Sequence, residues 1–206
     1  MKKIILLILC LSANAIFSQN AGLAGELVYI KQTSEAKAID VINSPQITDD
    51  SKADFIKLYN EVKAQMARLT MQMIADCARN NDLRSFKRID DLLLNTNIAA
   101  LGNTNLGTPK LNSYVAMLKK IHDAHEALMN FKPTPKSREE LATRGFLSGL
   151  GTIEGALDVF GTIQGILKDF RESREKKIDK ITTMLKEFQL VPLQDLEKTK
   201  AKKDEK

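Results

Sequence analysis

The chain has 206 residues, of which 31 are basic and 26 acidic, and its formal net charge is +5. A basic excess this small, mixed with acidic residues and not interleaved with aromatic ones, argues against a nucleic-acid-binding protein. Its only two cysteines are Cys10 and Cys77, which excludes a scaffold built on several disulfides.

The first residues, MKKIILLILCLSANAIFSQN, follow the pattern of a secretory signal peptide. Two lysines precede a short apolar run, and the letters ANA at 13–15 resemble a cleavage site, although cleavage after Ser18 fits nearly as well. The apolar run is shorter than the roughly 20 residues that a membrane-spanning helix needs. We therefore interpret 1–18 as a signal peptide and expect an exported protein, either periplasmic or secreted.

Two helices are expected in the first half of the mature chain. One covers 23–42, and Asn-Ser-Pro ends it. Asp49 or Asp50 can cap the second, which extends through Arg79. Its apolar residues alternate by three and four positions and so share one helical stripe: Phe55, Tyr59, Val62, Met66, Leu69 and Met73. We expect this stripe, with the nearby Cys77, to lie in the core.

A further helix is predicted from Leu83 to Leu94, after which a polar, glycine-containing loop covers 95–108. Pro109 then opens another helix at its favoured first position. The same spacing by three and four gives this helix an inward stripe: Leu111, Tyr114, Leu118, Ile121, His125 and Leu128. Methionines at helical spacing usually fill core gaps, and we expect this of Met66, Met71, Met73, Met117 and Met129.

Pro133 and Pro135 stiffen a linker, after which Ser137 and Glu140 can form a capping box for a final helical region. No stretch shows the short alternating runs of a β-protein. The prediction is an all-α fold: an elongated bundle of about four to five helices with coiled-coil-like stripes and a glycine-rich apolar segment. It forms a single helical domain over 19–192, followed by a disordered, charged and flexible C-terminal tail over 193–206.

The only histidines, His122 and His125, lie beside Asp123 and Glu126 in KIHDAHE. A metal could bridge such groups on one helix. However, His125 falls within the apolar stripe and nothing supplies a further set of ligands, so a polar residue in a helix seam is the preferred interpretation. The sequence has no recognisable catalytic triad or phosphate-binding loop. We expect no enzyme activity, no cofactor and no bound metal.

The stretch GTIEGALDVFGTIQGIL, at 151–167, repeats almost the same seven residues at an offset of ten. Glycine inside a helix costs about 0.5–1 kcal/mol relative to alanine, so several of them need a compensating contact. G-x-x-x-G spacing permits close helix packing, as in a glycine zipper. The candidate helix-contact residues have this spacing in three pairs: Gly145 and Gly149, Gly151 and Gly155, and Gly161 and Gly165.

Ten residues turn a straight helix by about 1000°, so the two copies face different directions and a bend or two separate contacts is expected. An apolar hairpin that can convert, or ordinary strands, are the alternatives for this segment. Glu154, Asp158 and Gln164 make a permanent membrane span unfavourable, but transient contact with a membrane stays open.

These features favour an exported, non-enzymatic helical protein that acts as a structural or assembly component, an adaptor or subunit, of a cell-envelope or secretion apparatus. Its partner is another protein, or itself, bound through the glycine-rich helix. The alternative is a membrane-active, pore-forming-type helical protein that inserts the glycine-rich segment 145–167.

Overall fold

The computed structural model of the protein describes residues 22–101, 104–137, 166 and 171–196. The helices there are α2 (Gly22–Asn43), α3 (Asp49–Ala78), α4 (Leu83–Asn95), α5 (Ile98–Leu101), α6 (Pro109–Asn130) and α9 (Arg174–Glu187). No β-strand occurs among these residues. The prediction of an all-α fold is confirmed.

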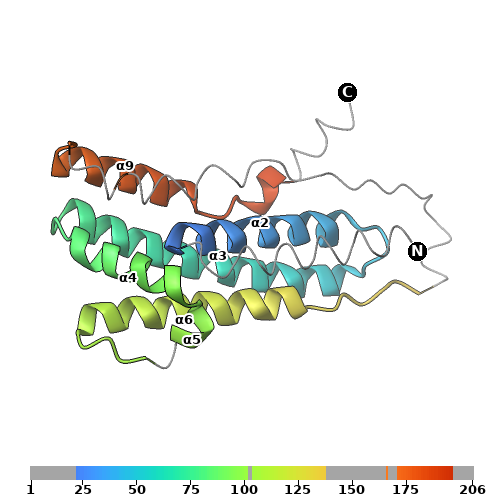
Figure 1. Ribbon diagram of the computed structural model, residues 1–206. Helices are drawn as coiled ribbons and strands as arrows, with labels where there is room; N and C mark the ends of the chain where they lie inside the picture. Colours follow the sequence, from blue (N-terminus) through green and yellow to red (C-terminus); the bar gives the residue numbers. More distant parts are fainter. Residues whose placement is uncertain (1–21, 102–103, 138–165, 167–170, 197–206) are drawn as a thin grey trace, which may run out of the picture.

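The longest helix, α3, lies at the centre of the bundle and packs against α2, α4, α6 and α9. Figure 1 shows α6 along one side of the α2–α3 pair and α9 along the opposite side. The short α5 packs on α6. The helices are therefore held together mainly by the faces of α3, and the amphipathic stripe predicted there explains why.

That stripe is buried as expected, and all six of its apolar side chains are fully inaccessible to solvent. The inward residues predicted for α6 are buried as well, and α4 buries Phe86, Ile89 and Leu93. The prediction for the methionines was only partly right. Met66 and Met73 lie in the core, but Met71 is 63% exposed and Met129 is 37% exposed. Met71 is two residues from Met73, and this spacing places it on the opposite face of α3.

Side-chain caps begin four of the helices. Thr48 accepts a hydrogen bond from the backbone N–H of Ser51 at the start of α3, so the expected cap at Asp49 or Asp50 was one or two residues late. Asp82, Thr108 and Ser173 cap α4, α6 and α9 in the same way. Each side-chain oxygen satisfies a backbone donor that has no partner inside its own helix.

The start of α2 is fixed by α4. Asp90 accepts a hydrogen bond from the backbone N–H of Leu23 at 2.9 Å. Gly22, which precedes Leu23, has a φ of +64°. A Cβ at position 22 would lie 2.5 Å from Asp90 Oδ1. Both the backbone conformation and the close approach require glycine here.

At the opposite end, the turn between α2 and α3 pairs with the linker after α6. Ile47 and Pro135 form an isolated antiparallel bridge. Backbone bonds flank it, from Thr48 N to Thr134 O at 3.1 Å and from Lys136 N to Gln46 O at 2.7 Å. The proline-containing linker is therefore held against the bundle.

Two local features differ from the sequence-based expectation. The predicted loop over 95–108 contains α5, whose Ile98 and Leu101 are buried. The expected tail over 193–206 starts with a helical turn at 193–196, where Leu196 is only 8% exposed. Residues 197–206 lie outside the described part of the chain.

Cys77 is 1% exposed, and burial raises the pKa of its thiol to about 11. We expect the folded mature protein, starting at residue 19, to resist a thiol-specific reagent at neutral pH and to react fully in denaturant, because the thiolate is the nucleophile that attacks the reagent and burial keeps Cys77 protonated and inaccessible. With a reagent that releases a chromophore on reaction, absorbance measures the rate and extent of Cys77 labelling. Fast labelling of the native protein would contradict the burial of Cys77, and a Cys77→Ala variant gives the background.

Candidate functional site

The six glycines predicted to form a helix contact, at positions 145, 149, 151, 155, 161 and 165, all lie outside the described residues. The same is true of Glu140 in the predicted capping box. The glycine contact therefore stays a prediction. Among the described helices, none is both long and apolar enough to cross a membrane.

His125 is buried between α2 and α6, with 7% of its surface exposed. Its Nε2 lies 2.8 Å from Thr33 Oγ1 on α2, and the ring of Tyr29 packs edge-on against the imidazole. Burial, with smaller contributions from His122 and Lys37, lowers the pKa of His125 to about 4. The imidazole is therefore neutral at physiological pH, as expected for a polar residue in a helix seam.

The hydrogen bonds around Thr33 determine what this pair can do chemically. Thr33 Oγ1 lies 2.7 Å from the backbone oxygen of Tyr29, so its single proton is donated there. His125 must then donate from Nε2 to Thr33, and cannot act as a base toward it. This arrangement holds α2 against α6 and does not activate the hydroxyl as a nucleophile.

His122 lies at the edge of the same helix face and is half-buried. No group of three or more His, Cys, Asp or Glu side chains in the described part of the chain is arranged to hold a metal ion. The structure thus brings His125 toward Thr33 and Tyr29 instead of joining the two histidines in one coordination site.

A second polar cluster lies at the corner between α3 and α4, and sequence reasoning did not identify it. The carboxylate of Asp76, 3% exposed, accepts a short hydrogen bond from the Tyr114 hydroxyl of α6. Its other donors are Gln72 Nε2 at 3.1 Å and Asn80 Nδ2 at 2.9 Å. Lys110 Nζ lies 3.1 Å from Asp76 and 2.9 Å from Asp82.

Burial alone would raise the pKa of Asp76, but hydrogen bonds from Tyr114, Gln72, Lys110 and Asn80 outweigh it and hold the pKa at about 2. The cluster therefore contains an ionised carboxylate whose donors come from α3, from the turn after it and from α6. A fully paired carboxylate of this kind is a poor general base at neutral pH, because its proton affinity is low.

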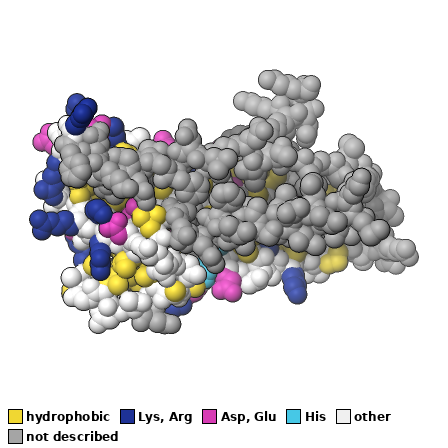
Figure 2. All heavy atoms as spheres, in the orientation of Figure 1, with side chains coloured by type: hydrophobic (Ala, Val, Ile, Leu, Met, Phe, Trp, Pro, Cys, Tyr) yellow, Lys and Arg dark blue, Asp and Glu magenta, His cyan; other side chains and the backbone are white. Residues whose placement is uncertain are grey.

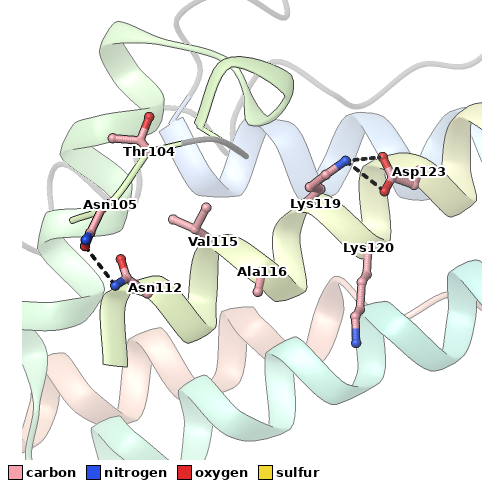
Figure 3. Close-up of a pocket in the computed structure, with 8 residues that line it drawn as sticks. All are labelled: Thr104, Asn105, Asn112, Val115, Ala116, Lys119, Lys120 and Asp123. Carbon is pink, nitrogen blue, oxygen red and sulfur yellow. Dashed lines mark hydrogen bonds and ion pairs between the residues drawn. The ribbon is translucent and has the colours of Figure 1, made fainter. Parts of the chain in front are cut away.

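The outer face of α6 carries an open groove of about 580 Å³, shown in Figure 3. Its lining residues are Thr104, Asn105, Asn112, Val115, Ala116, Lys119, Lys120 and Asp123. Most polar groups in it are already paired: Lys119 with Asp123 at 3.1 Å, and Asn112 with Asn105 at 3.0 Å. The groove therefore lacks a convergent set of free polar groups.

Figure 2 shows Lys and Arg side chains gathered at one end of the molecule, with acidic side chains between them. Arg79 and Arg84 are exposed near the α3–α4 corner, and the Arg174 guanidinium of α9 donates to the backbone oxygen of Asn81. This mixture of charges is typical of a solvated surface and agrees with the small net charge of the chain.

Comparison with protein-family models, with curated proteins and with solved structures returns no match. The function must therefore be argued from the residues themselves.

Sequence reasoning missed Asp76, Asp90 and Glu26, the buried acidic residues of the described helices. A signal was present for Asp76 and for Glu26. Asp76 follows Met73 by three residues and so falls within the α3 stripe, and Glu26 stands alone in the apolar run LAGELVYI. An acidic residue at an inward position predicts a specific partner or a shifted pKa.

Replacing Asp76 by Asn should lower the free energy of unfolding by about 2 kcal/mol at neutral pH, because the native carboxylate is stabilised relative to the unfolded chain. The same linkage predicts that this stabilisation is present above about pH 4 and disappears as the pH falls toward 2. Denaturant titration measures the change. Asp54→Asn removes only a surface pair with Lys57 and should cost less than about 1 kcal/mol.

His125→Leu should change stability at neutral pH by no more than about 1 kcal/mol, because the lost bond to Thr33 is offset by the removal of a polar group from the seam. Native His125 resists protonation, so its contribution to wild-type stability is complete above about pH 6.5 and falls as the pH approaches 4. Wild type should therefore lose up to about 3 kcal/mol relative to the variant over this range. A difference in the free energy of unfolding between wild type and His125→Leu that does not change with pH would contradict a buried, neutral His125. His122→Gln serves as the control.

Proposed function

We propose that the chain is an exported, non-enzymatic helical protein that serves as an adaptor or structural subunit of a cell-envelope or secretion apparatus. The signal-peptide pattern supports export. The glycine-rich segment supports assembly, because repeated G-x-x-x-G spacing is best explained by close contact with another helix, from the same chain or from a partner.

The observation that carries the non-enzymatic part of the proposal is the way the buried polar groups are used. Asp76, Asp90 and His125 each join two helices through hydrogen bonds. Catalytic groups are normally aimed into a cleft with partners that prepare them for proton transfer. Here the partners instead satisfy them within the bundle, which supports a role for these residues in holding the fold.

The second candidate is a membrane-active protein that inserts the segment 145–167. It is favoured by the length and apolar character of that segment, whose only charged residues are Glu154 and Asp158. The two candidates differ in what the glycines do: in an assembly subunit they permit close helix packing, whereas in an inserting segment their main effect is to keep the backbone adaptable.

Replacing Gly149 or Gly155 by Leu tests this difference. If the glycines permit close contact, added bulk should cost about 1–3 kcal/mol and disrupt assembly, outweighing the roughly 0.5–1 kcal/mol gained in helix propensity. Thermal unfolding and light scattering after size exclusion measure both effects.

More stable variants with normal assembly would contradict the contact role. Dye release from vesicles containing anionic lipid then decides the alternative: release by the wild type that the leucine variants lose would favour the membrane-active function.

A further inference from the structure

Glu26 is a buried acidic side chain on α2 that no contact within the described residues explains. It is 7% exposed, and its Oε1 has no hydrogen-bond partner among the described residues. Its neighbours on the helix, Leu23, Leu27 and Ile30, are themselves at most 2% exposed. A carboxylate with no partner in such surroundings is strongly destabilised relative to its protonated form.

The hydrogen bonds that connect α2 with other parts of the fold, called its polar ties below, are unevenly distributed along the helix. In its carboxy-terminal half, Thr33 bonds to His125, and Lys37 donates to the backbone oxygen of Phe131 at 3.1 Å. Lys31 donates to Glu187 O at 2.7 Å, and Glu35 accepts from Val191 N at 2.9 Å. The first turns, 22–28, are buried throughout but have one such tie in the described structure, from Leu23 to Asp90.

The charged and titratable groups on the packed elements do not neutralise Glu26. From α4, Asp90 is acidic and already bonded to Leu23. From α6, His125 is neutral and bonded to Thr33, and it contacts Tyr29 and Thr33, which lie about one and two helical turns further along α2 than Glu26. From α3, the Tyr59 hydroxyl donates to Val191 O, and its pKa is raised by burial and by Glu35, which places it beside the other half of α2.

On the remaining packed surface, α9 meets α2 through the backbone oxygen of Glu187, which Lys31 contacts. Burial is accordingly the cause that raises the pKa of Glu26, from 4.5 to about 7. Ionisation therefore begins near neutral pH, at a carboxyl group in the half of α2 that has few polar ties.

We propose that Glu26 is a pH-sensitive latch: its protonated form lets the first turns of α2 dock into the bundle, and its ionisation releases them while the second half of α2 stays attached. The released part would be 22–30, including the buried apolar side chains of Leu23, Leu27 and Ile30. The latch is independent of the proposed envelope role, since it depends only on contacts within the bundle.

Hydrogen exchange of the full mature protein, corrected for the intrinsic rate at each pH, tests the latch. Between about pH 6 and pH 8 the local opening of 23–30 should increase about tenfold, because the open state ionises with an ordinary pKa. The amides of 34–41 should not follow. In Glu26→Gln the rise should disappear, and Glu126→Gln, an exposed glutamate of α6, should retain it.

A Glu26→Leu variant gives a second neutral replacement in case the amide of Gln does not fit the apolar site, and it should also show no rise. Exchange of 23–30 that does not depend on pH in the wild type overturns the proposal. An equal increase in the exchange of 23–30 with pH in wild type and in both Glu26 variants also overturns it, because another group would then be titrating.

Discussion

Asp76 lies near the carboxy-terminal end of α3, where its carboxylate receives the Tyr114 hydroxyl of α6 while Lys110 bridges it to Asp82. Asp82 is also the residue that caps α4. The buried carboxylate of Asp76 thus connects the end of α3 with the start of α4 and with the side of α6 that carries Tyr114 and Lys110. Displacing any of these elements would leave a buried charge short of donors, which costs far more than an exposed pair gains. The central position of α3 in the bundle follows from this constraint together with its apolar stripe.

The two buried groups associated with α2 respond to pH in opposite directions. His125 has a lowered pKa and favours the folded state as the pH rises above the acidic range, whereas Glu26 has a raised pKa and favours it as the pH falls. Between about pH 4.5 and 6.5, folding releases a proton from one group and takes up a proton at the other, so the net uptake is close to zero. Each group can be strongly perturbed while the contributions of the two to the stability of the bundle largely cancel across that range.

Hydrophobic spacing predicted the all-α class and the buried stripes of α3 and α6, and with the capping and proline signals it placed both helices within one or two residues. These stripes depend only on the period of the α-helix, which is a local property of the sequence. The cap of α3 was misplaced because Thr48, Asp49 and Asp50 are all good capping residues. The polar ties could not be predicted, because the partners of Asp76 and His125 lie 38 and 92 residues away in the chain. Met71 and Met129 were misassigned because their residue type was given more weight than their position on the helix.

The segment after α9 completes the bundle by contacts that connect distant parts of the chain. Val191 donates its backbone N–H to Glu35 and accepts from the Tyr59 hydroxyl, while Lys31 reaches Glu187 O. These partners are separated by 132 to 156 residues. In a chain synthesised from its amino terminus, α2 and α3 emerge long before the residues that satisfy Glu35 and Tyr59. The two helices can pair early, but the flank of that pair that residues 187–191 contact stays open until those residues arrive. Order of synthesis and order of completion are thus opposed: α2 and α3 are made well before the residues that close this flank.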